Sequence, residues 1–509
     1  MKPFLRLERM RLHVVLLKGF KGCTYVAHSI GNVLLKEKSN ENQQNSGGGG
    51  LKIVLAMSEV VHGAELVTNG VSWVYTVNDA TKNFVTLDKG STPLEGMTTV
   101  DASLIPWEFT IDGTRYTVTE VGSEAFHGKS WLVGTLTFPD SVTSLGSCAF
   151  RKSKVSGVTT FGGITTMADR VLDGCTLKGG LPALTKVSSI GYAAFCDCYV
   201  EGYVVLHSAV KELGNNTFSQ CKITGIDLPK GMTTIGTGVF YANPIPELTL
   251  PDTVKTIGGR LVSFNTKVTT FVFPRSVTTI GKEAFLGCTN LKAMYIPGPP
   301  SVNSSEQTYT RVTGTDMFKN DTSLKLVLFG SNTKPENVSQ FSVAQSTDCK
   351  VFLPDNGFWD GIALGGTGNE AIFYHGFDGE GKSMTFTPTT AKELTDVLGA
   401  AADFKSLFGL DVRISVTNAL DLTGVQFDAE TLAAIPVTFD KFMFKVNSQE
   451  QLNDVLAALP DSVTVGIDPS SAGKAELAIP DGDKHNVWVL LPTSGKYRPY
   501  IGGMNIILR

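Results

Sequence analysis

A pattern of nine residues, Ile-Gly-x-x-Ala-Phe-x-x-Cys in outline, recurs along the middle of the chain and limits its fold more than any other feature. Its Phe position recurs every 22 to 24 residues and is occupied by Phe126, Phe150, Leu172, Phe195, Phe218, Phe240, Val262 and Phe285. A fixed period of this length is the signature of stacked units that share one core. The chain is therefore predicted to form a solenoid, with its function on the solenoid surface or in the segments at its ends.

Each repeat also contains a short strand that ends at a proline. Such strands are expected at residues 136–139, 226–229, 248–251, 271–274 and 294–297. Alternation with period two directs the flanking residues inward and the middle residue outward. Proline ends the strand because it has no N–H to give to the neighbouring turn. A weaker copy around Phe318 and a closing strand at 351–354 extend the pattern to residue 355.

This outline resembles the BspA-type leucine-rich repeats, which occur in many surface-exposed bacterial proteins and in some protist surface proteins. Spacing, glycine, phenylalanine and strand-ending proline agree over about nine turns within residues 118–355, with departures at Leu172 and Val262 in the Phe position. The resemblance implies a protein of the cell surface or the extracellular space that recognises proteins or glycans. It brings no catalytic residue and no cofactor to this chain.

The segment before the repeats divides into two parts. Residues 1–63 are polar and glycine-rich in their second half, and they are expected to form a disordered extension. Residues 51–63 within it are a candidate signal segment, with the mature chain starting near Ala64. The alternative is an ordinary cytoplasmic tail. Residues 64–117 are expected to form an N-terminal β cap on the solenoid.

A second, different repeat lies near the C-terminus. Two stretches align at an offset of 58 residues, and each reads as strand, helix, strand, strand. Thr390 and Ser448 are the expected N-caps of the two helices. Residues 384–509 are thus predicted to form a duplicated C-terminal α/β (α+β) domain after a linker at 356–383. The whole chain is predicted to be a β-rich leucine-rich-repeat solenoid between a β cap and this domain.

Composition excludes two classes of partner. The net charge is −4, and no block rich in Lys or Arg is present, so nucleic acid is not an expected partner. No apolar run approaches the ~20 residues that a membrane-spanning helix needs. The expected partner is an extracellular protein or glycan.

Motifs that suggest chemistry have simpler interpretations. Residues 376–383 fit the phosphate-loop string Gly-x(4)-Gly-Lys-Ser, but a strand-like stretch closed by Pro388 follows where that motif requires a helix. Residues 355–361 offer oxygen ligands for calcium but no bidentate Glu, which favours a turn. The seven His residues show no metal-binding spacing. No catalytic group, metal site or cofactor is predicted.

Four cysteines share one position of the repeat, three residues after the Phe position. They are Cys175, Cys198, Cys221 and Cys288. This spacing favours buried thiols that pack as small apolar side chains. A disulfide between neighbouring turns, or metal binding at the Cys196-x-Cys198 pair, are the alternatives.

Three classes of function remain open from the sequence. The favoured one is a non-enzymatic binding or adhesion protein. The second is a glycan-active enzyme with its site in the C-terminal domain, although the acids Asp411, Asp421, Asp428 and Glu430 show no spacing that specifies such chemistry. The third is an intracellular scaffold.

The outward residues of successive strands indicate where contacts are made. In chain order they are Thr137, Thr159, Val205, Asp227, Thr249, Val272, Tyr295, Leu328 and Phe352. This outward column becomes apolar toward its C-terminal end, and exposed apolar patches usually mark contact surfaces. Leu328 and Phe352 are predicted to pack against the C-terminal domain. A ligand edge is predicted at Asp227, Thr249, Val272 and Tyr295, the alternative being that Tyr295 only covers neighbouring strands.

Overall fold

The computed structural model describes residues 13–18, 24–30, 33–34, 64–297, 301–303, 317–330, 343–355, 364–377, 382–423, 425, 427, 429–471, 476–491, 494–500 and 506–507. The candidate signal segment at 51–63 lies outside these residues, as do parts of the two loops considered for phosphate and calcium. The chain forms two compact units, residues 1–207 and 208–509, and each is described by itself.

The first unit begins with a β cap that shares a sheet with the first repeats. Its strands are β4 (Ala64–Thr68), β5 (Val71–Asp79), β6 (Phe84–Leu87), β9 (Glu108–Ile111) and β10 (Thr114–Val121). β10 runs parallel to the first of the short strands β12 (Ser144–Leu145), β14 (Thr166–Met167) and β15 (Ser189–Ile190), which follow one another in the sheet. Trp73 of β5 is fully buried and meets Phe126 edge-on, so the cap closes the end of the Phe column.

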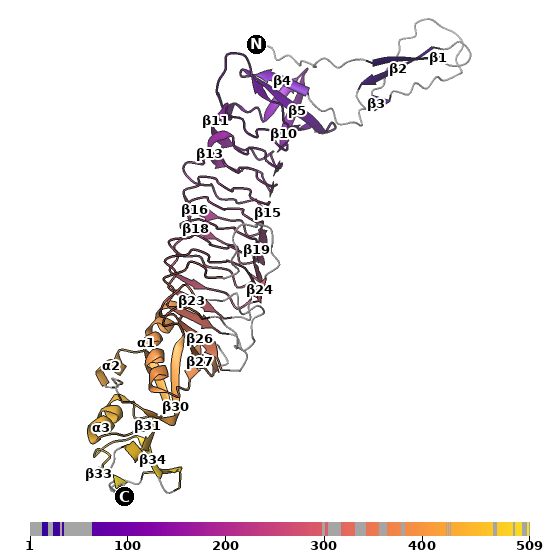
Figure 1. The fold of residues 1–509 in the computed structure, drawn as a ribbon. Coiled ribbons are helices and arrows are strands. Elements are labelled where there is room, and N and C mark those ends of the chain that lie inside the picture. Colours follow the sequence, from indigo (N-terminus) through magenta and orange to yellow (C-terminus); the bar gives the residue numbers. More distant parts are fainter. Residues whose placement is uncertain are drawn as a thin grey trace. The chain divides into compact units, whose positions relative to one another are not determined.

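A second sheet of the first unit contains the strand that leads into Pro139. It consists of β8 (Val100–Asp101), β11 (Leu132–Thr137) and β13 (Lys154–Thr160), all parallel (Figure 1). Between the two sheets the rings of Phe126 and Phe150 stack with centroids 5.1 Å apart. One turn of the repeat therefore contributes one strand to each sheet and one ring to the core.

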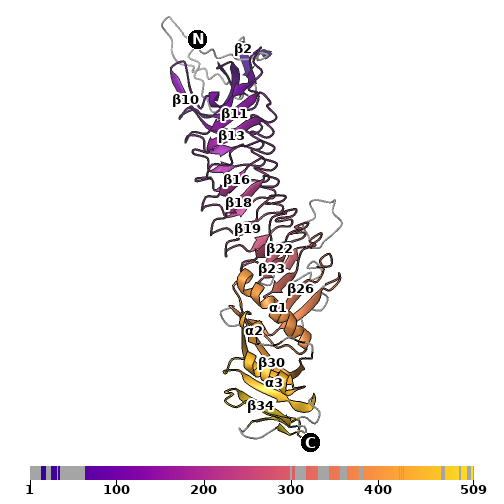
Figure 2. The same ribbon diagram turned by 90° about the vertical axis from the view of Figure 1, so that its left-hand side faces the viewer.

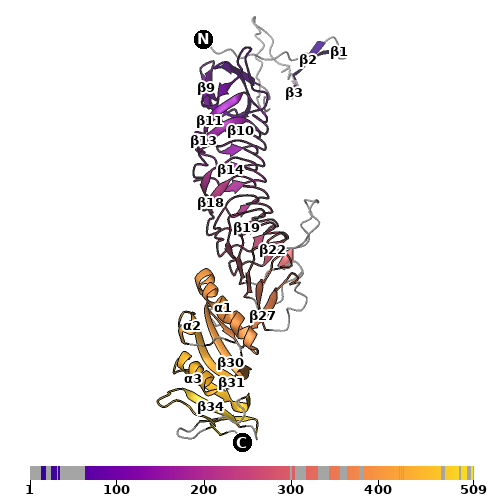
Figure 3. The same cartoon turned by 60° about the vertical axis from the view of Figure 1, so that its left-hand side comes forward.

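The second unit repeats this plan with two longer sheets. The first, the corner sheet, is β17 (Glu212–Leu213), β19 (Thr234–Ile235), β20 (Thr256–Ile257), β22 (Thr279–Gly281) and β24 (Ser301–Asn303). The second, the outward sheet, is β21 (Thr270–Val272), β23 (Ala293–Ile296), β25 (Leu326–Phe329), β26 (Lys350–Pro354) and β27 (Glu370–Tyr374) (Figure 3). β18 (Ile223–Asp227) precedes them in the chain. The segment expected to be a linker contains β27, where Ile372 pairs with the outward residue Phe352 and is buried in the same apolar cluster.

Side chains at the position three residues after the Phe position form a buried polar column between turns. Four of them donate a hydrogen bond to the carbonyl of the Phe-position residue one turn earlier: Cys175 to Phe150 at 3.1 Å, Cys198 to Leu172 at 2.7 Å, Asn243 to Phe218 at 2.7 Å and Cys288 to Val262 at 3.2 Å. Asn265 donates instead to the Ile245 carbonyl at 2.8 Å, and Cys221 to that of Ser219 at 3.5 Å. The seven cysteines of the described residues are free thiols. Burial raises the pKa of Cys175 to about 11, so this thiol keeps the proton that it donates.

The Phe column carries a direct prediction about stability. Phe218 is fully buried and its ring stacks on Phe240 with centroids 6.5 Å apart. Phe218→Ala should lower the free energy of unfolding by roughly 3–5 kcal/mol, because the neighbouring turns cannot collapse into the cavity. Urea denaturation monitored by circular dichroism measures this loss. Equal midpoints for the variant and the parent chain would contradict a shared core.

The C-terminal domain is a mainly parallel sheet with helices along one face. Its strands are β28 (Gly376–Phe377), β29 (Ser383–Phe386), β30 (Asp411–Asp421), β31 (Val437–Lys445), β32 (Thr464–Asp468), β34 (Asn486–Leu491) and β35 (Lys496–Pro499), and they are neighbours in that order. The helices are α1 (Ala391–Phe408), α2 (Ala429–Ala433) and α3 (Gln449–Ala458). β29-α1-β30 and β31-α3-β32 correspond to the two related units that the sequence predicted. A short pair, β33 (Glu476–Leu477) and β36 (Ile506–Ile507), lies apart from this sheet.

Candidate functional site

The outward column is exposed in its earlier turns and covered in its later ones. In the second unit, Asp227 and Thr249 are exposed and Val272 is 40% exposed. Tyr295 on the next strand is 5% exposed, and Leu328 and Phe352 are fully buried. The change occurs between β21 and β23, so the cover over the outward sheet begins there.

Helix α1 is this cover, and its sequence explains where it begins and ends. The Thr390 hydroxyl accepts the Glu393 N–H at 3.1 Å, and Glu393 in turn accepts the Thr390 N–H, which completes a capping box. The buried residues of α1 recur with helical spacing: Leu394, Val397, Leu398, Ala400, Ala401 and Phe404. The helix ends at Gly409, whose φ of 69° suits glycine at a helix C-terminus. The sequence therefore predicted both the helix and its Thr390 cap.

Helix α1 lies beside the outward-sheet strands β23 and β26 (Figures 1 and 2). The ring of Phe404 meets Phe352 on β26 edge-on, with centroids 4.7 Å apart. Phe408, one turn later, lies 5.4 Å from Tyr295 on β23. Leu328, Phe352 and Phe404 belong to one buried cluster that continues into the C-terminal domain, and partly buried Phe408 packs against it.

Charged side chains join the start of α1 to β26 and β27. Lys350 Nζ lies 2.6 Å from the Glu370 carboxylate and 3.1 Å from that of Asp396, and Lys392 of the helix contacts both acids. Hydrogen bonds from Lys350 and Lys392 lower the pKa of Glu370 to about 2. A lowered acid pKa stabilises the fold at neutral pH, and this stabilisation is lost as the pH falls from about 4.5 toward 2.

Tyr295 was expected at an open ligand edge, and the structure places its ring under the C-terminal domain instead. Phe377 and Phe408 lie over it with centroid distances of 6.2 and 5.4 Å. Burial raises the pKa of Tyr295 to about 12, against the opposing effect of the Arg275 charge. The ring is too deeply buried to be an exposed anchor, and it belongs to the floor of the site described next.

A groove of about 720 Å³ lies where α1 ends on the outward sheet, and it is called the strand-face groove here. Three of the four residues expected at the ligand edge line it, namely Thr249, Val272 and Tyr295. Ser406 and Leu407 of the last helical turn form the opposite wall. Asp227 is exposed one turn earlier on β18 and does not line the groove.

The groove combines apolar walls with a few charges. Val272 and Leu407, 40% and 37% exposed, are its open apolar side chains. Its charged residues are Glu247, Asp252 and Arg275, and all three are exposed. Strand alternation predicted the sheet wall. It could not predict Leu407, because this residue lies off the buried stripe of α1 and only the fold brings it opposite Val272.

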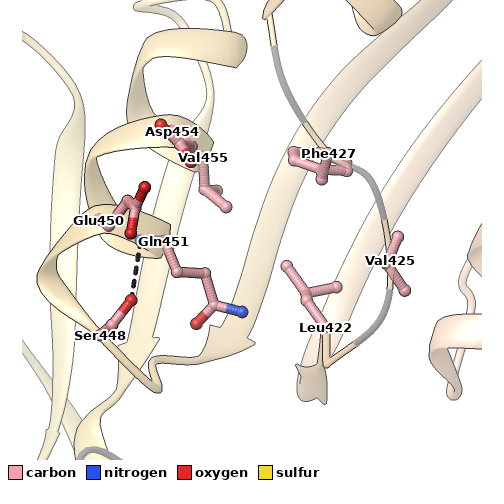
Figure 4. Close-up of a pocket in the computed structure, with 8 residues that line it drawn as sticks. All are labelled: Leu422, Val425, Phe427, Ser448, Glu450, Gln451, Asp454 and Val455. Atoms are coloured by element: carbon pink, nitrogen blue, oxygen red, sulfur yellow. Dashed lines mark hydrogen bonds between the residues drawn. The ribbon is translucent and has the colours of Figure 1, made fainter.

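A smaller cavity of about 300 Å³ lies at the start of α3 (Figure 4). Leu422, Val425 and Phe427 form its apolar side, and Ser448 caps the helix by accepting the Gln451 N–H at 3.1 Å. The acids of its rim, Glu450 and Asp454, lie one helical turn apart and are exposed.

The acids considered for glycan chemistry have local structural contacts. Asp411 accepts a hydrogen bond from Lys405 at 2.6 Å. Asp421 accepts two from Thr423, which lower its pKa. Glu430 lies in the first turn of α2, and Asp428 lies outside the described residues. Asp411, Asp421 and Glu430 line neither the strand-face groove nor the smaller cavity.

Among the described residues, one group of three side chains could hold a metal ion: Asp173, Cys196 and Asp197. The Asp173 carboxylate already accepts the Arg151 Nε–H at 2.8 Å and lies 3.7 Å from Arg170. Two guanidinium groups at this distance oppose a further cation. Cys198 is turned into the core and donates to Leu172, so it forms no ligand pair with Cys196.

Comparison with known proteins agrees with the repeat pattern. Residues 109–218 and 188–325 match the family described as the BspA type Leucine rich repeat region, in six copies. No curated protein matches the chain. In the part of the chain that the structure describes, no helix has the length and hydropathy needed to cross a bilayer.

Three solved structures are similar to the chain. A leucine-rich cell surface protein from Faecalibacterium prausnitzii is 16% identical, covers 60% of this chain and 94% of its own, and has a TM-score of 0.38. A leucine-rich repeat protein from Bacteroides ovatus is 17% identical, with coverages of 79% and 99% and a TM-score of 0.37. The pneumococcal vaccine antigen PcpA is 15% identical, with coverages of 61% and 99% and a TM-score of 0.27.

Proposed function

We propose that this chain, whose residues 109–325 match the BspA type leucine-rich repeat family, is a non-enzymatic binding or adhesion protein. It acts at the cell surface or in the extracellular space and recognises a protein or glycan through the strand-face groove. The observation that supports this proposal most is the groove itself, where exposed Val272 and Leu407 face the same volume of about 720 Å³.

The rigidity of the groove favours binding without rearrangement. Phe404 and Phe408 attach α1 to β26 and β23 through ring contacts, so the helical wall is held in place before a ligand arrives. A preformed site loses less conformational entropy on binding than a mobile one. Asp227 and Thr249 extend the ligand edge along the exposed sheet beside the groove.

Binding to arrays of extracellular proteins and of glycans tests the proposal. The full chain should retain one or more partners, and Val272→Asp or Leu407→Asp should weaken each by about tenfold or more, because a charge would replace an apolar contact. Phe373→Asp is the matched control, since Phe373 is 51% exposed but lies outside the groove. Unchanged binding in both groove variants would contradict the proposal.

Two further measurements decide between the function classes. Surface-protease shaving of intact cells should remove the protein if it is exposed on the cell. Release of a shortened product from a bound glycan would indicate an enzyme, and complete protection from the protease would favour an intracellular scaffold.

A further inference from the structure

The groove favours one kind of ligand chemistry, and this inference rests on the proposed function. We infer that the strand-face groove binds a short protein segment in which an aliphatic side chain lies next to a basic one. The segment would place its aliphatic side chain between Val272 and Leu407 and its basic side chain toward Glu247 or Asp252.

The apolar walls favour an aliphatic anchor over a sugar. The two aromatic rings of the lining, Phe273 and Tyr295, are 1% and 5% exposed. Open aromatic faces on which sugar rings stack are common in glycan-binding sites, and neither ring offers one. Val272 and Leu407 instead expose branched aliphatic groups, which pack well against another aliphatic side chain. The volume of about 720 Å³ lies within the roughly 300–1,000 Å³ typical of small-ligand pockets, so it admits a few residues of a peptide.

The charge of the groove favours a basic neighbour. Glu247 and Asp252 contribute two carboxylates, against one guanidinium from Arg275. The C-terminal end of α1 adds a partial negative charge, because Ser406 and Leu407 belong to its last turn. Lys405 in the same turn does not cancel this charge, since its Nζ is bound to Asp411 at 2.6 Å. Arg275 lies near Tyr295 and would repel a basic side chain there, so the basic side chain of the segment is placed toward Glu247 or Asp252 instead.

Selection from a phage-displayed library of random peptides on the full chain tests this inference. Peptides that bind should carry an aliphatic residue beside Lys or Arg. Their affinity, measured by fluorescence anisotropy, should fall about tenfold in the Glu247→Lys/Asp252→Lys variant. It should also weaken between 50 mM and 500 mM salt, because exposed charges are screened. Glu212→Lys is the control, since Glu212 is an exposed acid of β17 in the corner sheet.

The outcomes separate this inference from the proposed function. Suppose that the selected peptides carry no basic residue and do not bind the Val272→Asp variant. This result would overturn the inference but would leave the groove as a binding site. Enrichment of acidic peptides, or binding of glycans alone, would likewise overturn the inference without contradicting the groove as a binding site. If every partner and peptide binds Val272→Asp as it binds the parent chain, the proposed function fails as well.

Discussion

Replacing Leu328 and Phe352 together with serine is expected to lower the free energy of unfolding of the second unit by roughly 5–8 kcal/mol. Both side chains are fully buried, and large-to-small changes at such positions cost about 2–5 kcal/mol each. The two residues are direct neighbours on β25 and β26, so their effects overlap and fall short of the simple sum. Native proteins are stable by only about 5–15 kcal/mol, so the double variant should release α1 from the outward sheet.

Hydrogen exchange and limited proteolysis measure this release. Amides of α1 should exchange faster in the double variant, and protease cleavage should concentrate within residues 391–408. Phe373→Ser is the matched control, because Phe373 lies on β27 of the same sheet but is 51% exposed. Unchanged protection of α1 in the double variant would show that these contacts do not hold the helix.

The same variant connects stability to the proposed function. Leu407 reaches the groove only while Phe404 and Phe408 hold α1 against Phe352 and Tyr295. Release of the helix should therefore abolish groove-dependent binding even though Val272 and Leu407 themselves are unchanged. The single variant Phe352→Leu keeps an apolar side chain there and is expected to preserve both the helix and the binding.

Period and alternation predicted the solenoid and the direction of each side chain. The recurrence of the Phe position predicted the stacked rings of Phe218 and Phe240. Alternation also predicted that Tyr295 points outward from its strand. It could not predict that α1 covers this face, because the periodicity of a strand specifies a face and not what packs on it. The groove depends on that tertiary contact, so only its sheet wall could be predicted from the sequence.

The hydrogen bonds of the polar column are a second feature that the sequence analysis did not predict. Spacing predicted that Cys175 and Cys198 are buried, but it treated them as small apolar side chains. In the structure they donate hydrogen bonds to carbonyls of the preceding turn, as Asn243 does. The common requirement is a buried donor, which thiols and amides both satisfy. Both Cys and Asn occur three residues after the Phe position in this chain. Because both side chains can donate a hydrogen bond, this shared property could have indicated the role from the sequence.

Asp321 occupies the next position of this column after Cys288. The column requires a buried hydrogen-bond donor, and the carboxyl group of Asp321 is a donor only when it is protonated. It follows Phe318 by three residues and is fully buried. Among the described residues no donor has hydrogen-bond geometry toward either carboxylate oxygen, although the Cys288 N–H is close enough to oppose the rise of the pKa. Burial raises the pKa of Asp321 from 3.8 to about 8. An ionised carboxylate cannot donate, whereas the protonated acid and the Asn side chain can.

The raised pKa fixes the sign of a pH effect. The folded state binds a proton at Asp321 that the unfolded state has already lost between about pH 4 and pH 8. The contribution of this residue to stability therefore decreases as the pH rises through that window, by about 1.4 kcal/mol per pH unit. Above pH 8 the carboxylate is charged in both states, and the contribution stays at its lowest value.

Asp321→Asn should consequently stabilise the second unit, and by more at pH 9 than at pH 5. At pH 5 the protonated acid and the amide are similar donors, so the midpoints of urea denaturation should nearly coincide. At pH 9 the amide removes a buried charge, and a gain of roughly 3–5 kcal/mol is expected. Asp252→Asn, at an exposed acid, is the control and should show no such difference. A gain of equal size at both pH values would mean that the Asp321 carboxyl does not titrate in this window, and a loss at pH 9 would mean that its charge is stabilised in the fold.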